Sequence, residues 1–339
     1  MKLKRFAGNP ILAPNPANAW ESSVTTNPGA WYDAATGQVL MLYRAAGADA
    51  EHRVHFGLAT SRDGYHFTRA ADRPAFSPSR NGFDAGCVED PRVVKMGDWY
   101  YVTYAARPFP PGEYWLTGEA KRYHAPVCPP EFPWMLRTNA TWTGLALTRD
   151  FWEWIRLGPI THGQDDNRDV ILFPEKVGGQ FALLHRPANL VGPQYGLDNP
   201  AIWISFSDDL LTWERGQVLA KGEYAWEGGK IGGNTPPIRT PHGWLTLYHA
   251  VGADKLYRLG ALLLDLDNPA IVRYRTRHWL LQPEEWYERQ GYYPGVCFPC
   301  GKVVIGDTLF VYYGGADKYV GLATCSLSEL LADLTTQPC

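Results

Sequence analysis

Two short sequence phrases alternate along this chain, and each of them occurs five times. The first phrase is a strand, a turn rich in Ser, Thr and Asp, and an aromatic or apolar residue that opens another strand. Its copies lie at residues 54–69, 142–157, 202–216, 259–274 and 320–334. The second phrase is a proline-led strand followed by a nearly continuous apolar strand, with copies at 27–45, 90–106, 173–187, 236–250 and 298–316. Continuous apolar runs of this kind are typical of strands buried on both faces.

The spacing of the repeats predicts the fold. The intervals are 61, 81, 63 and 64 residues when the equivalent positions are taken as Tyr43, Tyr104, His185, Tyr248 and Tyr312. Four strands in a repeat of about this length are typical of a β-propeller blade. We therefore predict an all-β chain that forms one five-bladed β-propeller over residues 1–339. A generic β-sandwich is the alternative, and the alternating recurrence of both phrases disfavours it.

The one long interval contains residues 107–139, which are rich in proline and aromatic residues. Long segments of this kind in compact domains are usually functional or disordered, and the aromatic content argues against disorder. We expect a long inserted loop near the mouth of the propeller channel.

Composition excludes several classes of function. The 32 Lys and Arg residues against 35 Asp and Glu give a net charge of −3, which does not indicate a nucleic-acid or anionic-membrane partner. The first ten residues, MKLKRFAGNP, lack the apolar segment of a signal peptide, so a cytoplasmic location is expected. Six cysteines are scattered, and the pair Cys297 and Cys300 has no second pair at zinc-site spacing, so we expect buried thiols and no metal.

Polar and charged residues recur at equivalent ends of the predicted inner strands. They follow the apolar strand in one set of repeats and open the proline-led strand in another; the residues are Asn27, Arg44, Asp90, Arg168, Arg186, Lys230, His249 and Asp317. A propeller brings such positions together at one mouth of its channel. Arg168, Arg186, Lys230 and His249, expected to come from three blades, suit a phosphate, which favours charge-assisted donors.

Two neighbouring carboxylates, Glu89 and Asp90, precede Pro91. Alternation along a strand lets one of them face the channel. By equivalence with Asn27 we expect that one to be Asp90, while Glu89 supports the backbone or Arg92. A lone acid beside a phosphate site suggests a general acid that works with inorganic phosphate as nucleophile. Phosphate-binding loops of the GxxxxGKS and GxGxxG types, HExxH and GxSxG are all absent from the sequence.

The motifs NPGA, LYRA, GLATSRDG, VEDPR, TGLALTRD, DNRDVILFPEK, LHRP, AIWISFS, GKIGGNTPPI, LYHA and YYGGAD occur in this order from Asn9 to about Leu330. Together they resemble glycoside hydrolase family 130. The resemblance implies a five-bladed propeller and a β-mannoside phosphorylase, although a smaller group in the family hydrolyses β-1,2-mannosides. It also implies an inverting reaction that yields α-mannose 1-phosphate, in which Asp90 is the general acid and relays its proton through the 3-hydroxyl of the bound mannose.

The resemblance also implies roles for the other residues. Phosphate would be held by Arg168, Arg186, Lys230 and His249, and mannose by Asn27, Arg44 and Asp317. In the insertion, which we expect to build the acceptor side of the cleft, Tyr114 and Trp115, with Tyr123 and Trp134, are candidates for stacking on a sugar. One departure is Asp169, where family members also carry Asn.

Several alternatives stay open at this point. The linkage is β-1,2 or β-1,4, and the leaving sugar is mannose, glucose or N-acetylglucosamine. A β-1,2-mannosidase that uses water, or a sugar-binding propeller without activity, would fit the same fold. The expected partners are a manno-oligosaccharide and inorganic phosphate as co-substrate, with no cofactor, nucleic acid or membrane, and a homo-oligomer is allowed.

Overall fold

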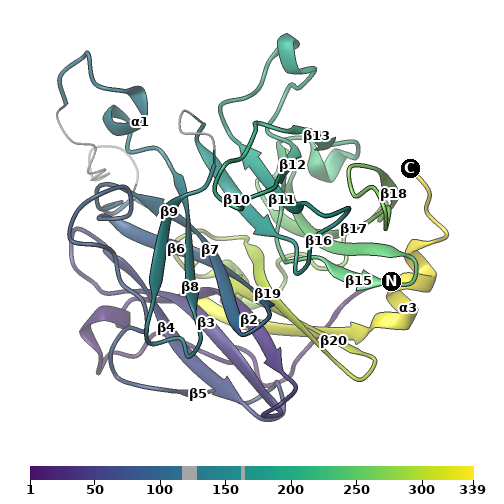
Figure 1. The fold of residues 1–339 in the computed structure, drawn as a ribbon. Coiled ribbons are helices and arrows are strands. Elements are labelled where there is room, and N and C mark those ends of the chain that lie inside the picture. Colours follow the sequence, from purple (N-terminus) through teal and green to yellow (C-terminus); the bar gives the residue numbers. More distant parts are fainter. Residues whose placement is uncertain (117–127, 162–164) are drawn as a thin grey trace.

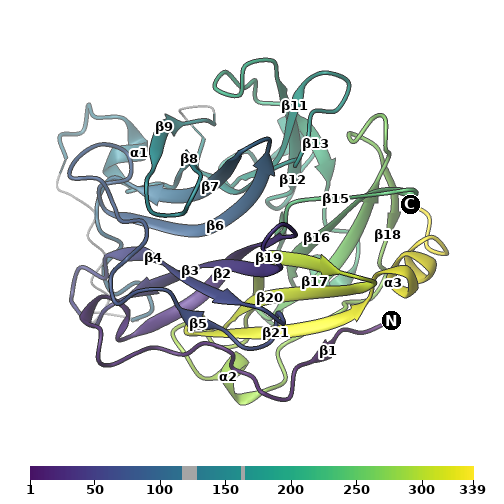
Figure 2. The ribbon, with the colours of Figure 1, turned by 60° about the horizontal axis from the view of Figure 1, so that its bottom comes forward.

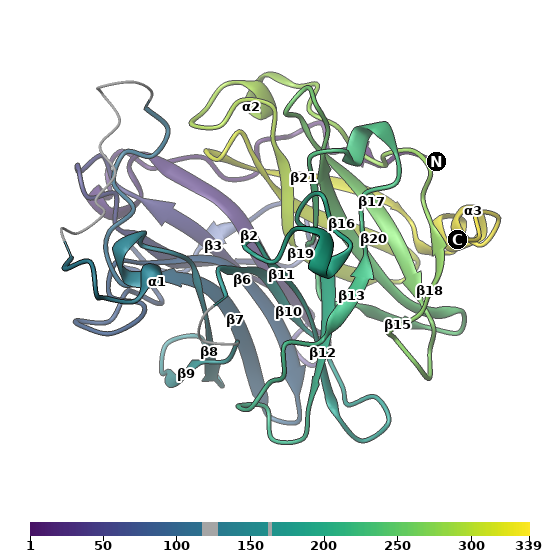
Figure 3. The same ribbon diagram turned by 90° about the horizontal axis from the view of Figure 1, so that it is seen from above.

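The computed structural model of the protein describes residues 1–116, 128–161 and 165–339. Five antiparallel β-sheets are arranged around a common centre (Figures 1 and 3), and strands of neighbouring sheets are in contact. This arrangement confirms the predicted all-β, five-bladed propeller. In the described part of the chain, no helix is both long and apolar enough to span a bilayer.

The blades follow one another along the chain, and their strands run from the centre outward. Blade 1 comprises β2 (Val24–Asp33), β3 (Gln38–Ala46), β4 (Val54–Ser61) and β5 (Thr68–Arg69). Blade 2 comprises β6 (Cys87–Met96), β7 (Trp99–Arg107), β8 (Trp142–Thr148) and β9 (Ile155–Pro159). Blade 3 comprises β10 (Asn167–Leu172), β11 (Phe181–Pro187), β12 (Ile202–Ser207) and β13 (Gln217–Ala220).

Blade 4 comprises β14 (Lys230–Gly233), β15 (Ile238–Thr240), β16 (Gly243–Val251), β17 (Tyr257–Leu264) and β18 (Val272–Arg275). Blade 5 comprises β19 (Cys297–Ile305), β20 (Thr308–Gly315), β21 (Tyr319–Ser326) and β1 (Lys4–Arg5). The α-helices are short and peripheral: α1 (Trp134–Arg137), α2 (Trp286–Arg289) and α3 (Leu327–Leu334).

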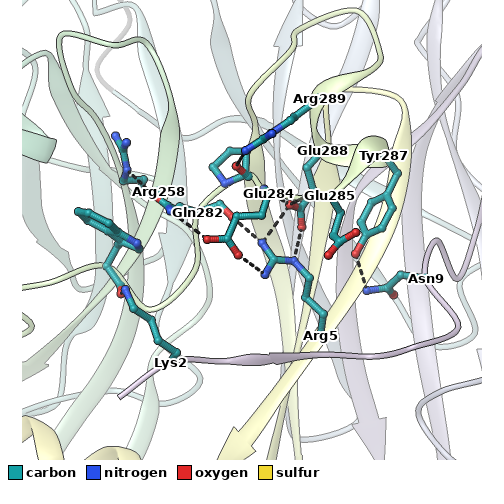
Figure 4. A network of polar contacts seen from close by, with 12 residues as sticks. Lys2, Arg5, Asn9, Arg258, Gln282, Glu284, Glu285, Tyr287, Glu288 and Arg289 are labelled. Carbon is teal, nitrogen blue, oxygen red and sulfur yellow. Dashed lines mark hydrogen bonds and ion pairs between the residues drawn. The ribbon is translucent and has the colours of Figure 1, made fainter.

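The N-terminal strand closes the ring of blades. β1 pairs antiparallel with β21, with Lys4 opposite Thr324, so the first strand of the chain becomes the outermost strand of the last blade (Figure 2). The side chain of Arg5 adds polar contacts to this pairing (Figure 4). Its Nε donates to Glu288 Oε1 at 2.8 Å, and Nη1 donates to Glu284 Oε2 at 3.0 Å.

In four of the five blades a buried carboxylate ties the inner and outer parts of the blade together. It precedes the innermost strand and accepts hydrogen bonds from a tyrosine of the next strand and from an arginine at the outermost strand, an arrangement that we call the carboxylate clamp. The four complete clamps are Glu21 with Tyr43 and Arg69, Asp84 with Tyr104 and Arg156, Glu227 with Tyr248 and Arg275, and Glu288 with Tyr313 and Arg5.

The clamp explains the glycine in the first sequence phrase. Gly57, Gly144, Gly260 and Gly321 lie opposite the four clamp tyrosines on the neighbouring strand. A Cβ at Gly260 would lie 2.6 Å from the ring of Tyr248, and the other three would be as close or closer to theirs. The tyrosine in blade 5 is therefore Tyr313, and the predicted equivalence of Tyr312 is wrong by one residue.

Blade 3 carries a variant of the same arrangement. Arg215 Nε donates to Asp165 Oδ2 at 3.2 Å, but the tyrosine position is occupied by His185. The ring of His185 bonds to Asn167 at 3.0 Å and to Ser205 at 2.8 Å, and the residue opposite it is Trp203 rather than glycine. The smaller imidazole removes the need for a glycine, so tyrosine and glycine are replaced together.

The described parts of the predicted insertion are residues 107–116 and 128–139, while its candidate Tyr123 lies outside the described residues. Asn139 joins the two ends of the insertion. Its side chain accepts from Phe109 N at 3.2 Å and donates to Phe109 O at 2.9 Å. This pairing fixes the direction in which residues 110–116 leave blade 2.

Loss of the ring-closing arginine should destabilise the whole propeller. Arg5→Met would leave Glu288, whose side chain is 0% exposed, without its cation. Breaking a buried pair in this way costs about 3–5 kcal/mol of unfolding free energy. Arg273→Met on β18 removes the cation of a more exposed pair with Asp265 and should cost less than about 1 kcal/mol. Urea unfolding measures both, and equal losses would contradict the role of the clamp.

Candidate active site

A cavity of about 310 Å³ is lined by residues from all five blades. The structure brings together at this cavity nine of the residues that the sequence predicts: Asn27, Arg44, Asp90, Tyr114, Arg168, Arg186, Lys230, His249 and Asp317. Two further candidates, Trp115 and Trp134, do not line the cavity.

Bulges in three inner strands aim polar side chains into the cavity. Asn27, Asp90 and Asp169 have positive φ angles of 41°, 54° and 54°, and the strand register shifts at each of them. Such backbone conformations are unfavourable for residues other than glycine and are found mainly at functional sites. The expected equivalence of Asn27 and Asp90 is confirmed, and the third member of the set is Asp169 rather than Arg168.

The bulge corrects the prediction for Glu89. Both Glu89 and Asp90 line the cavity, because the bulge interrupts the alternation of side chains along β6. Glu89 Oε1 lies 3.7 Å from Arg44 Nη2. Arg92 instead donates from Nη1 to the backbone carbonyl of Asp90 at 2.7 Å, so it supports the bulge itself.

Arg44 and Asp90 form the centre of one half of the cavity. Asp90 Oδ1 accepts hydrogen bonds from Asn27 Nδ2 at 2.8 Å and from Arg44 Nη1 at 3.3 Å. Arg44 Nη2 donates to the hydroxyl of Tyr114 at 3.1 Å, and its buried Nε has no hydrogen-bond partner. A buried guanidinium with one free donor is suited to a ligand hydroxyl.

The other half of the cavity is cationic. Arg168 and Arg186 belong to blade 3 and Lys230 and His249 to blade 4, so the cluster comes from two neighbouring blades and not from three. Arg186 Nε donates to Asp169 Oδ2 at 2.6 Å, and Arg168 is paired with Asp166 at 3.0 Å.

The two blade 4 members are also held in place. Lys230 Nζ donates to the hydroxyl of Tyr257 at 2.5 Å. His249 Nδ1 lies 2.9 Å from Asn234 Oδ1, while its buried Nε2 has no hydrogen-bond partner. The Nε2 atom therefore leaves a polar position free for a ligand.

Burial shifts the ionisation of several of these groups. Burial and the neighbouring Arg186 lower the pKa of Lys230 to about 7, and burial lowers the pKa of His249 well below its usual range. Burial raises the pKa of Asp317 to about 6, although Arg44 opposes the shift. Burial alone would raise the pKa of Asp169, but Arg186 and His249 hold it below its usual range. A bound anion would favour the charged form of Lys230.

Tyr114 and Trp115 have different positions. Tyr114 lies in the cavity wall, and its hydroxyl accepts a hydrogen bond from Arg44, one of the predicted mannose residues. Trp115 stacks on Tyr292 with ring centroids 4.1 Å apart and contacts the ring of His52 at 4.5 Å. Trp115 therefore lies outside the cavity wall, and its packing on Tyr292 anchors the segment.

Further cavity residues were missed from the sequence: Arg107, Asp169, Tyr257, Tyr293 and Phe298. Asp169 directly follows Arg168 and was noticed only as a departure from the family. Tyr257 carries no local motif and comes to Lys230 through the pairing of both their strands with β16, and Tyr293 packs on the ring of Tyr257. Among the residues that the structure describes, no group of three His, Cys, Asp or Glu side chains could hold a metal ion. Cys297 and Cys300 are buried free thiols.

The fold and the cavity define a five-bladed propeller with a central polar site. The family model described as beta-1,4-mannooligosaccharide phosphorylase matches residues 2–112 and 136–336. The chain therefore belongs to glycoside hydrolase family 130.

Known mannoside phosphorylases are similar over most of this chain. A 1,2-beta-oligomannan phosphorylase of Thermoanaerobacter sp. is 35% identical over 338 residues, covering 97% of this chain and 99% of that protein. A beta-1,2-mannobiose phosphorylase of Listeria innocua is 34% identical over 283 residues, covering 83% of this chain and 68% of that protein. The solved structure of a beta-1,2-mannobiose phosphorylase from Listeria innocua, in complex with beta-1,2-mannobiose, has a TM-score of 0.80 at 27% identity and covers 99% of this chain and 100% of its own.

The cationic half of the cavity requires glycine at position 232. A Cβ at Gly232 would lie 2.7 Å from Arg186 Nε and closer still to Asp169 Oδ2 and His249 Cε1. Gly232→Ala should therefore separate Arg186 from Asp169 and weaken the binding of inorganic phosphate, measured by calorimetry, about tenfold or more.

Gly228→Ala is the matched control, because a Cβ there has only an ordinary contact at 3.5 Å with Ala225 O. We expect its phosphate binding to match that of the unmodified protein. Unchanged phosphate binding in Gly232→Ala would show that this cluster does not hold phosphate.

Proposed function

We propose that this chain is a β-mannoside phosphorylase. It cleaves the terminal β-mannosidic bond of a manno-oligosaccharide with inorganic phosphate and releases α-mannose 1-phosphate. The observation that carries the proposal is one cavity with two halves: Asp90, Asn27 and Arg44 in one, and four nitrogen-bearing side chains in the other. The similarity to mannoside phosphorylases over nearly the whole chain supports the same function.

The cationic half is suited to phosphate rather than to water. Phosphate needs several charge-assisted donors, whereas an attacking water needs a base. Arg186 is fixed by Asp169 at 2.6 Å, and Lys230 by Tyr257 at 2.5 Å, so two donors are already oriented before phosphate binds. Arg168 is paired with Asp166 and would share its charge between that carboxylate and phosphate.

Asp90 is the proposed general acid. Its carboxylate is held by Asn27 and Arg44, and its backbone is held in the bulge by Arg92. Phosphate that attacks the anomeric carbon from the face opposite the leaving sugar inverts a β-mannoside to an α-phosphate. Asn27, Arg44, Asp317 and Tyr114 are the proposed mannose contacts, and phosphate needs no further base because it is already an anion.

We propose β-1,2-linked mannosides as the preferred substrates. The two curated relatives described above are named for β-1,2-linked substrates, although the family description names β-1,4-linked ones. The cytoplasmic location, the homo-oligomer and the lack of a cofactor stay predictions from the sequence.

Incubation with β-1,2- or β-1,4-mannobiose, with and without inorganic phosphate, tests the proposed function. We expect mannose 1-phosphate only when phosphate is present, and faster formation from the β-1,2-linked disaccharide; anion-exchange chromatography of the products measures both. Free mannose without phosphate would instead identify a hydrolase, and no product in either buffer would indicate a binding protein.

Asp90→Asn should lower phosphorolysis of mannobiose by about 10²–10⁴-fold, because the amide cannot donate the proton. The same variant should retain far more activity on β-mannosyl fluoride, since fluoride leaves without protonation. Glu89→Gln is the comparison, and we expect a smaller loss that is similar for both substrates. Equal losses of Asp90→Asn on both substrates, measured as kcat, would exclude Asp90 as the acid.

A further inference from the structure

Tyr257 contacts two members of the cationic half, Lys230 and His249, without belonging to it. It opens β17 in blade 4 and lines the cavity. Its hydroxyl accepts the hydrogen bond from Lys230 Nζ at 2.5 Å, and the same ammonium lies 4.6 Å from the centre of its ring. The imidazole of His249 stacks on the ring of Tyr257, with ring centroids 5.6 Å apart and an interplanar angle of 21°.

The ring of Tyr257 is itself held firmly. Its backbone N donates to Gly295 O at 2.9 Å, and β-pairing places it opposite Val251. Tyr293 contacts the ring edge-on at 5.6 Å, and Phe298 packs at 6.3 Å. A side chain fixed by both strand pairing and aromatic packing can fix others in turn.

Lysine needs such support more than arginine does. Its ammonium is a point charge on a flexible four-carbon chain, and ordering that chain has an entropic cost. Arg186 has a carboxylate partner, Asp169, that sets its position, whereas the short contact of Lys230 is to the hydroxyl of Tyr257.

We propose that Tyr257 is a positioning residue of the phosphate subsite, in which its hydroxyl orients the ammonium of Lys230 and its ring orients the imidazole of His249. The inference rests on the proposed phosphorolysis and names a residue that neither the sequence motifs nor the family resemblance indicates. Tyr257 acts through Lys230 and His249 and takes no part in bond breaking.

The position of the hydroxyl also predicts a pH dependence. The charged and titratable groups that face Lys230 are Arg168, Arg186, Asp169, Asp317, His249 and Tyr257. Burial and Arg186 lower the pKa of Lys230 to about 7, so its charged form is present below that pH and is lost above it. Phosphate affinity should fall as the pH rises through this value. Without the hydroxyl acceptor the charged form of Lys230 is less stable, so phosphate affinity should begin to fall at a lower pH.

Tyr257→Phe is the decisive variant, because it removes the hydroxyl and keeps the ring. We expect the KM for phosphate at pH 7 to rise about tenfold, with the KM for mannobiose within about twofold of the unmodified enzyme. Tyr274→Phe on β18 of the same blade, away from the cavity, is the control and should change neither value. Thermal unfolding checks that both variants fold.

The pH profile separates positioning from a general structural effect. Between pH 5.5 and 8.5, the part of the rise in KM for phosphate that is due to loss of charge on Lys230 should start at a lower pH in Tyr257→Phe and should be absent in Lys230→Arg, because arginine stays charged. The ionisation of phosphate itself contributes equally to every variant. A Tyr257→Phe enzyme with unchanged phosphate KM and pH profile, or with both KM values raised alike, would overturn the inference.

Calorimetric titration with inorganic phosphate keeps this test independent of turnover. If the unmodified protein shows no phosphorolysis but binds phosphate more tightly than Tyr257→Phe, the proposed function fails and the positioning role stands. If phosphorolysis is present and the two proteins bind phosphate equally, the positioning role fails and the proposed function stands.

Discussion

The carboxylate clamp is the interaction on which the rest of this structure depends. Removing a carboxylate from water is very unfavourable unless it is paired and hydrogen-bonded, and each complete clamp meets both conditions with an arginine and a tyrosine. Because the arginine lies on the outermost strand and the carboxylate precedes the innermost, the clamp fixes the width of a blade. In blade 5 the arginine is Arg5, so the same interaction that shapes a blade also closes the ring.

A closed ring can hold strained backbone at its centre. Asn27, Asp90 and Asp169 keep positive φ angles because the surrounding strands leave no alternative, and each bulge turns a polar side chain into the cavity. The positive charges of two cavity arginines are offset by acidic partners: Asp90 lies against Arg44, and Asp169 lies against Arg186. The cavity is therefore ordered before any ligand enters, which lowers the entropic cost of binding.

Sequence reasoning succeeded where the pattern of strands and turns repeats from blade to blade. The five-fold phrases predicted five blades, and equivalent strand ends predicted which residues from Asn27 to Asp317 would meet. It failed where the alternation or the register of a strand could not be read from the sequence. Alternation assigned Glu89 to the wrong side because a bulge shifts the register, and the adjacent tyrosines at 312 and 313 could not be distinguished until the glycine opposite one of them was known.

The sequence by itself determined the number of blades, the identity of the polar residues at their inner ends and the family to which they point. These properties follow from local pattern, since strand period and turn composition are encoded within a few residues. Only the tertiary structure decided that Tyr257 holds Lys230, that Trp115 is used for anchoring, and that Arg5 completes the last blade. Each of these contacts joins segments whose approach is set by strand register and by the packing of one blade on the next, for which no short motif exists.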